Sequence, residues 1–183
     1  MDGSSVAADA AIEVHGLTKT FKSVEAVRGI DLKVRAGETF GFLGPNGAGK
    51  STTIKILCTL ANATSGTARV AGFDVATERD AVRRSIGLVF QEPTLDGYLT
   101  AEQNLRFHGE LYGVDRSTAV ARRKEVLEMV GLYDRRDHLV QTFSGGMRRR
   151  LEIARGLLHS PKVLFLDEPT IGLDPQTRAS IWQ

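Results

Sequence analysis

The stretch Gly44-Pro-Asn-Gly-Ala-Gly-Lys-Ser-Thr52 decides how the rest of the chain is interpreted. It fits the P-loop pattern, in which two glycines enclose four residues and are followed by lysine and then by serine or threonine. Because Gly44, Gly47 and Gly49 have no Cβ, the backbone can bend sharply and point several N–H groups inward. These donors meet the positive N-terminus of a following helix, so the stretch predicts a binding site for a polyphosphate.

The side chains of the stretch complete this predicted site. Lys50 would reach the β- and γ-phosphates of a nucleotide, where its charge would also serve catalysis, and Ser51 would offer its hydroxyl to Mg²⁺. We expect the nucleotide to be contacted by Gly44, Pro45, Asn46, Gly47, Ala48, Gly49, Lys50, Ser51 and Thr52.

The flanking segments agree with a P-loop. Residues 39–43 predict a short buried strand and residues 53–60 predict a helix. Strand, glycine loop and helix is the setting that a P-loop requires. A plain glycine-rich turn between a strand and a helix is the alternative.

Composition excludes several other classes of protein. The 183 residues suffice for one domain that buries about 70% of its unfolded surface. A net charge of +2 calls for no nucleic-acid partner. The single cysteine, Cys58, excludes an internal disulfide framework, and the four scattered histidines lack metal-ligand spacing.

The start of the chain and its hydropathy bear on the membrane. Residues 1–11 lack the features of a secretory signal and predict a disordered lead-in. No apolar run approaches the roughly 18–20 residues that a membrane-spanning helix needs. Any role at a membrane would therefore come through a partner.

Periodicity predicts strands first and helices later. Alternating side chains at residues 12–17 and 30–34 predict half-exposed strands of an antiparallel sheet. Residues 67–70 predict another short strand, and residues 85–90 a buried strand that stops at Gln91.

Residues from about 92 to 143 change character and predict an inserted helical subdomain. Thr100 and Gln103 match a capping box, in which each side chain binds the other residue's backbone N–H. One face of that helix is predicted to carry Leu105, Leu111 and Tyr112, and one side of a second helix to carry Ala119, Val126, Leu127 and Val130.

The last third of the chain predicts another helix and strand. A helix opens at Ser144 and has an apolar face made of Met147, Leu151, Ala154 and Leu158. Residues 163–166 predict a central parallel strand covered on both faces. Asp167 and Glu168 follow this strand, at the carboxyl end where open α/β sheets bind ligands.

The P-loop, the Ser-Gly-Gly helix start and the strand ending in Asp-Glu together resemble the nucleotide-binding domain of ATP-binding cassette (ABC) proteins. Within that family the sequence is most similar to ATP-binding subunits of bacterial drug-efflux transporters of the daunorubicin-resistance type. The similarity lies at residues 53–57, 100–105 and 144–151. The resemblance implies an α/β fold with a RecA-like P-loop core, an N-terminal antiparallel β subdomain and the inserted helical subdomain. It covers residues 12–183 as a single domain.

The resemblance also implies roles for three polar residues near the ends of the buried strands. Asp167 would hold Mg²⁺ through water, and Glu168 would polarise the attacking water as general base. Gln91 would contact both Mg²⁺ and that water. A helix cap for Asp167 and an ordinary exposed carboxylate for Glu168 are the alternatives.

Further implied contacts concern the nucleotide and a second protomer. Phe21 would stack on adenine, although a phenylalanine is also a common core residue. Ser144, Gly145 and Gly146 would bind the γ-phosphate of ATP held by another protomer. Asp174 would belong to the D-loop, which crosses the dimer interface.

Two positions beside these glycines depart from the family pattern. Phe143 and Met147 stand where the family usually has leucine and glutamine, which puts the role of the fifth signature position in doubt. The three arginines at residues 148–150 are expected on a solvated helix face rather than at a nucleic-acid contact.

Function follows from the resemblance as an expectation. ATP hydrolysis with Mg²⁺ would drive export of a drug-like or hydrophobic substrate through an integral membrane permease subunit. Two nucleotide-binding subunits, as a homodimer, would face each other as peripheral subunits at the cytoplasmic face of the cell membrane. The alternatives are a non-transport ABC ATPase of DNA repair or translation, and a regulatory module that holds nucleotide without turnover.

The chain stops at Gln183, before the switch histidine that the family carries beyond the D-loop. We therefore expect that the last core strands and this histidine are missing. A chain of this extent should bind ATP weakly and hydrolyse it poorly.

Overall fold

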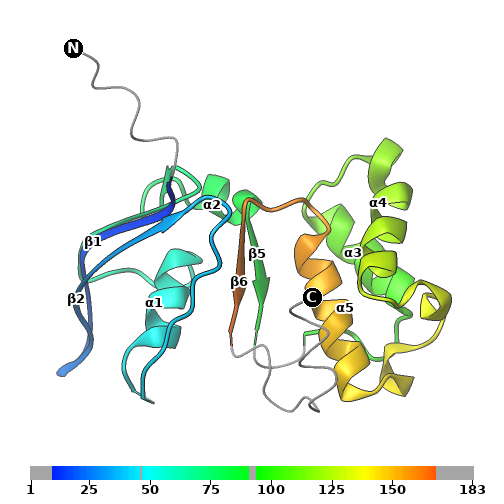
Figure 1. Cartoon of the computed structure of the whole chain (residues 1–183), viewed down its shortest axis with the longest axis horizontal. Coiled ribbons are helices and arrows are strands. Elements are labelled where there is room, and N and C mark those ends of the chain that lie inside the picture. Colours follow the sequence, from blue (N-terminus) through cyan, green and yellow to red (C-terminus); the bar gives the residue numbers. More distant parts are fainter. Residues whose placement is uncertain (1–9, 46, 91–93, 168–183) are drawn as a thin grey trace. The chain divides into compact units, whose positions relative to one another are not determined.

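The structure, a computed structural model, describes residues 10–45, 47–90 and 94–167. These residues fall into two compact units, the first ending at Ile86 and the second beginning at Gly87. Figure 1 labels the elements of both units.

An antiparallel sheet dominates the first unit. Its strands are β1 (Ala10–Phe21), β2 (Val24–Arg35), β3 (Ser65–Val70) and β4 (Phe73–Asp74), in the order β2-β1-β3-β4. Figure 1 shows β1 and β2 as the two long blue strands. In the middle strand, Val14 pairs with Leu32 on one side and with Ala68 on the other. The antiparallel sheet and the strand at residues 67–70 are therefore confirmed.

Apolar side chains of this sheet form the core of the first unit. Val14, Leu17 and Val70 are fully buried. Two helices complete the unit, α1 (Lys50–Leu57) and α2 (Arg79–Ser85). α1 buries Ile56 and Leu57, so the helix predicted after the P-loop is present, and it begins at Lys50 itself.

The strand predicted at residues 39–43 is absent, so that prediction is wrong. Leu43 is 96% exposed, and Phe40 is exposed as well. A strand needs a neighbour to take up its N–H and C=O groups. Among the described residues, no strand pairs with this segment.

The second unit combines a small sheet with helices. β5 (Ile86–Val89) and β6 (Val163–Leu166) are neighbouring strands, and their arrows point the same way in Figure 1. The helices are α3 (Ala101–Leu111), α4 (Arg116–Met129) and α5 (Gly145–Leu157), with short 3₁₀ turns η1 (Tyr133–Arg135) and η2 (Val140–Thr142). The strands predicted before Gln91 and at residues 163–166 are present. In β6 only Phe165 is buried, so coverage on both faces is incomplete.

One apolar core joins the three helices of the second unit. Leu105, Leu127 and Leu151, one from each helix, are fully inaccessible to solvent. The whole cluster comprises Ala101, Leu105, Val126, Leu127, Leu132, Val140, Phe143, Leu151, Ala154 and Leu158. The apolar face predicted for α5 is confirmed, and that of α4 is confirmed at Val126, Leu127 and Val130.

The start of α3 follows its prediction, whereas one residue at its end does not. Gln103 N–H donates to Thr100 Oγ1 at 3.1 Å, and Thr100 N–H donates to Gln103 Oε1 at 2.8 Å, so the capping box is confirmed. Leu111 is 70% exposed, and its place on the buried face was wrongly predicted. At 3.6 residues per turn it lies about 120° around the helix from Leu105.

Within the described part of the chain, no helix combines the length and the apolar character needed to cross a membrane.

One close approach in the first sheet yields a stability prediction. A Cβ at Gly66 would lie 2.3 Å from the carbonyl oxygen of Gly16, whereas a Cβ at Gly72 would meet nothing within 4 Å; both residues have φ above +80°. We expect Gly72→Ala to lower the free energy of unfolding by about 1 kcal/mol, the cost of a left-handed φ. Gly66→Ala should lower it by about 3 kcal/mol because β1 and β3 must also separate.

Urea unfolding of both variants beside the parent protein measures this difference. Equal losses for Gly66→Ala and Gly72→Ala would contradict the tight approach of β3 to β1.

Candidate functional site

The glycine loop adopts the backbone conformations that its sequence predicts. Gly44, Gly47 and Gly49 have φ angles of 151°, 83° and 84°. Side chains rarely tolerate such angles, so these glycines fix the bends of the loop. Ala48 N–H donates to Pro45 O at 3.3 Å and closes the turn.

Gly49 joins the loop to the first sheet. A Cβ at this position would lie 2.3 Å from the carbonyl oxygen of Ala26 in β2. Gly49 is also the N-cap of α1, and its own carbonyl accepts from Thr53 N–H at 2.8 Å. The loop, the helix start and β2 therefore meet at a point where only glycine fits.

Lys50 folds back over the loop that precedes it. Its Nζ donates to the carbonyl oxygens of Gly44 at 2.6 Å and Pro45 at 2.8 Å. The first turn of α1 contains no acidic residue, so no carboxylate there offsets the positive end of the helix dipole. Gly44, Pro45, Gly47, Ala48 and Ser51 are exposed to solvent. The loop is thus an open, positively charged cup that can receive an anion.

Phe21 lies at the exposed end of the β1–β2 hairpin. Phe21 pairs with Val24 in the register of the two strands. The residue is 50% exposed, and Lys19 Nζ lies 4.8 Å from the centroid of its ring. The core alternative for Phe21 is therefore wrong. Phe21 ends β1, whereas Ala26, whose carbonyl lies against Gly49, belongs to β2 of the same hairpin.

Asp167 is fixed at the end of the small sheet in the second unit. Its N–H donates to the carbonyl oxygen of Val89 at 3.0 Å, which joins the carboxyl ends of β5 and β6. Gln91 follows Val89 by two residues along the chain. Among the predicted site residues, Asn46, Gln91, Glu168 and Asp174 lie outside the described residues.

The first turn of α5 carries the predicted signature residues. Ser144 is the N-cap, and its Oγ accepts from Met147 N–H at 3.2 Å. Phe143 is buried, and the Met147 side chain packs against the same core. Gly145 is exposed, and a Cβ there would meet nothing within 4 Å, so this helix start is open.

Two of the three arginines after Met147 bind backbone carbonyls, so the prediction of a solvated face is wrong for Arg149 and Arg150. Arg149 donates to the carbonyl oxygens of Phe90 and Asp167, at 2.5 and 3.2 Å. Arg150 donates to Val130 O at 2.9 Å. Burial lowers the pKa of the Arg149 guanidinium, and the nearby carboxylates of Glu152 and Asp167 oppose this shift.

Sequence reasoning also missed Glu152, which is 2% exposed. Its Oε1 accepts from Thr94 N–H at 2.6 Å and from Thr94 Oγ1 at 3.3 Å. The available signal was spacing, because Arg149, Glu152 and Arg155 stand on successive turns of α5 beside its apolar face.

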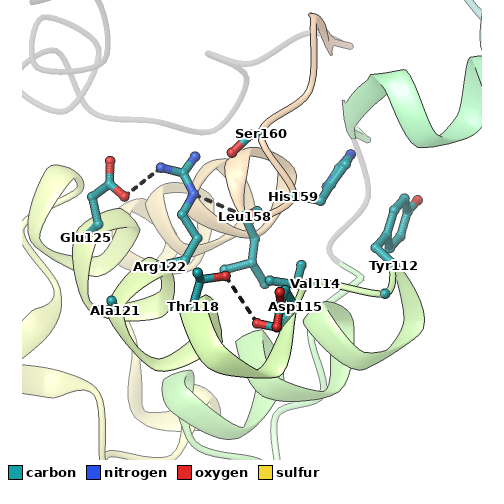
Figure 2. Close-up of a pocket in the computed structure, with 11 residues that line it drawn as sticks. Tyr112, Val114, Asp115, Thr118, Ala121, Arg122, Glu125, Leu158, His159 and Ser160 are labelled. Atoms are coloured by element: carbon teal, nitrogen blue, oxygen red, sulfur yellow. Dashed lines mark hydrogen bonds and ion pairs between the residues drawn. The ribbon is translucent and has the colours of Figure 1, made fainter.

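A pocket of about 500 Å³ lies beside the C-terminal end of α5. Figure 2 shows Arg122 of α4 reaching across it, where the guanidinium donates to the carbonyls of Leu157 and Leu158 and pairs with Glu125 at 2.7 Å. Arg122 thereby satisfies the last carbonyls of α5. None of the described site residues lines this pocket.

Ser51 in the first unit offers a hydroxyl, and Asp167 in the second unit offers a carboxylate. Each is an oxygen ligand of the kind that Mg²⁺ prefers. Over residues 10–45, 47–90 and 94–167, no group of three or more His, Cys, Asp or Glu side chains forms a metal cage.

Comparison with known proteins places the chain. It is 51% identical over 172 residues to the daunorubicin/doxorubicin resistance ATP-binding protein DrrA of Streptomyces peucetius, covering 94% of this chain and 52% of that protein. It is 44% identical over 170 residues to the linearmycin resistance ATP-binding protein LnrL of Bacillus subtilis, covering 93% of this chain and 55% of that protein. The chain thus spans about half the length of these curated relatives.

Solved structures agree with the sequence relatives. The structure of cbiO1 from Clostridium perfringens, part of the ABC transporter complex cbiONQ, matches with a TM-score of 0.86 and 30% identity, covering 94% of this chain and 71% of that one. The α/β P-loop fold predicted from the motifs is therefore confirmed. The ABC transporter family model matches residues 27–171, and the chain belongs to that family.

Proposed function

We propose that this chain binds MgATP and forms part of a subunit that hydrolyses ATP to power export through a separate membrane subunit. The proposal rests on the solvent-exposed glycine loop at the start of α1, where Lys50 binds carbonyl groups of the same loop. The chain spans about half the length of its curated relatives. The protein to be tested is therefore one of the relatives' length that contains this chain.

The cup would bind the phosphate tail of ATP. Backbone N–H groups between Gly47 and Ser51 would donate to phosphate oxygens, and Lys50 would exchange its two carbonyl partners for the β- and γ-phosphates. Phe21 would stack on the adenine, which its exposed ring allows. Asn46, Ala48 and Thr52 would complete the contacts.

Hydrolysis would depend on the acids that follow β6. Mg²⁺, held by Ser51, Asp167 and Gln91, would supply charge neutralisation at the phosphates. Glu168 would accept a proton from the attacking water, and Gln91 would orient that water. The hydrogen bond from Asp167 N–H to Val89 O supports the role proposed for Asp167, because it holds Asp167 beside β5, the strand that precedes Gln91 in the chain.

A second protomer would complete each site. Ser144, Gly145 and Gly146 at the start of α5 would face the γ-phosphate held by the other protomer, with Asp174 crossing the interface. Two identical subunits would then meet about a two-fold axis with two ATP molecules between them. The exposed start of α5, with nothing within 4 Å of a Cβ at Gly145, supports this arrangement.

The relatives' names suggest the cargo. The chain is similar to resistance proteins for daunorubicin, doxorubicin and linearmycin, so we infer export of a drug-like or hydrophobic compound. An integral membrane permease would form the path, with this subunit peripheral at the cytoplasmic face. Purification from solubilised membranes should recover an integral membrane protein with the subunit, and recovery of DNA or ribosomes in its place would contradict transport.

Replacing Lys50 tests the nucleotide site. Lys50→Ala should raise the Kd for MgATP at least about tenfold, because a charge-assisted hydrogen bond contributes about 1.5–3 kcal/mol. Lys55→Ala is the matched control, since Lys55 is exposed in the last turn of the same helix. Titration calorimetry measures both, and an unchanged Kd in Lys50→Ala would refute binding in the cup.

Replacing Gly145 tests the two-protomer site. Gly145→Asp should leave MgATP binding to the isolated subunit and the unfolding midpoint unchanged, because a side chain fits there without contacts. The kcat should fall about a hundredfold or more, since a carboxylate would oppose the γ-phosphate of the partner's ATP. Gly145→Ala adds no charge and should lose far less. Full turnover in Gly145→Asp would exclude the proposed sandwich.

A further inference from the structure

α1, the helix that follows the glycine loop, ends in a backbone turn that usually contains glycine. Leu60 N–H donates to Lys55 O at 2.8 Å. Thr59 N–H donates to Ile56 O at 3.0 Å. This pair of bonds forms a Schellman motif, in which the first residue after the helix cap takes a left-handed φ and is most often glycine. In this chain that residue is Thr59, with a φ of 61°.

Threonine is an unfavourable residue for this position. At positive φ its Cβ crowds the carbonyl group that follows, so β-branched side chains are seldom found there. Thr59 is nevertheless only 1% exposed, so its side chain is enclosed by neighbouring residues of the first unit. The contacts of this side chain therefore have to offset the strain of its backbone.

Two arginines of α2 bind Thr59. Arg83 Nε donates to Thr59 Oγ1 at 2.9 Å, and Arg79 Nη2 donates to the Thr59 carbonyl oxygen at 2.6 Å. The other arm of the Arg79 guanidinium donates to Asn62 Oδ1 at 3.0 Å. Thr59, Arg79 and Arg83 are here called the α1 latch. A glycine at position 59 would relax the backbone, but it would remove the hydroxyl that accepts from Arg83.

The latch carries a second cost besides the strained φ. Arg79 Nε is buried and has no hydrogen-bond partner among the described residues. A buried donor of this kind loses the hydration that it has in the unfolded chain. The Arg79 cation lies at the negative end of the α1 dipole, which offsets part of this loss. Neither cost is needed to end a helix, because a glycine would do so alone. Both fit a contact that holds α1 in one position.

α2 is itself anchored to the first sheet. Val82 is fully buried, and Glu78 Oε2 accepts from the N–H of Asp74 in β4 at 2.8 Å. At the other end of α1, Gly49 lies so close to the Ala26 carbonyl of β2 that a Cβ would clash with it. The latch and Gly49 therefore hold α1 at both of its ends.

α1 is too short to keep its shape by itself. Its eight residues span about 12 Å at 1.5 Å per residue. Isolated helices shorter than about 12–15 residues are marginal in water, so α1 depends on tertiary contacts. The direction of the helix sets the direction of its first N–H groups and of its dipole, at the end that carries the glycine loop. A loosened C-terminal end would therefore misalign the donors at the N-terminal end.

We propose that the α1 latch positions the nucleotide site, by holding α1 so that Lys50 and the first N–H groups of the helix point at the phosphates. Thr59, Arg79 and Arg83 are thus positioning residues, which act through α1 and not by contact with the nucleotide. This inference rests on the proposed function, because the latch matters for activity only if phosphates bind at the start of α1.

The test compares Thr59→Ser with Thr59→Ala in the protein of the relatives' length. Both variants lose the methyl group of Thr59, but only serine keeps a hydroxyl for Arg83. Thr59→Ala should raise the Kd for MgATP about three- to thirtyfold, because small misplacements of binding groups are costly. Thr59→Ser keeps the hydrogen bond and should stay within about twofold of the parent. Titration calorimetry well below the unfolding midpoint measures the Kd of folded protein.

A merely structural role predicts a different pattern. Arg83→Ala should raise the Kd as far as Thr59→Ala does, and the double variant should lose no more than either single variant, because all three lack the same hydrogen bond. A structural role would lower the unfolding midpoint and leave the Kd unchanged. Arg84→Ala is the matched control, since Arg84 is the adjacent exposed arginine of α2 and should leave the Kd unchanged. An unchanged Kd in Thr59→Ala, equal Kd values for the serine and alanine variants, or additive losses would overturn the latch.

Arg79 provides a readout that does not require the Thr59 variants to fold. Arg79→Lys keeps the charge but lacks the fork that reaches Thr59 and Asn62 together, so it should also raise the Kd for MgATP. An unchanged Kd in Arg79→Lys would overturn the latch. A parent protein that does not bind MgATP would overturn the proposed function and the latch with it. A parent that binds MgATP, with variants that bind it equally well, would overturn the latch alone.

Discussion

The approach of the Ala26 carbonyl to Gly49 constrains the site in the first unit. Since a Cβ at position 49 would lie 2.3 Å from that oxygen, the loop can contact β2 in this way only if residue 49 is glycine. The loop then enters α1 with its N–H groups uncovered, beside a helix terminus without acidic residues. Lys50 binds carbonyl groups of the same loop. An incoming phosphate would therefore meet donors that are already oriented.

In the second unit, α5 makes three kinds of contact. Its apolar face anchors the core through Leu151, and its first turn carries the open Ser144 cap. Arg149, beside that face, binds the end of β6 through the carbonyl oxygen of Asp167. One helix therefore connects the core of the second unit, the open Ser144 cap and the end of β6.

Sequence predicted the features that depend on local periodicity and local chemistry. The alternation around Val14, the capping box at Thr100 and the apolar face through Leu151 need only neighbours along the chain. Residues 39–43 read as a strand because their composition suits one, but a strand exists only where a distant partner pairs with it. The fork of Arg149 escaped prediction for the same reason, since its acceptors lie far away in sequence.

Met147 illustrates how the signature can change without losing its geometry. The cap on α5 uses the Met147 backbone N–H and the Ser144 hydroxyl, so any residue except proline could provide that bond at this position. The thioether packs against the core instead of facing solvent. In the proposed two-protomer site, the backbone around Gly145 and the dipole of α5 would therefore face the anion, and a glutamine at position 147 would add a contact to that arrangement without creating it.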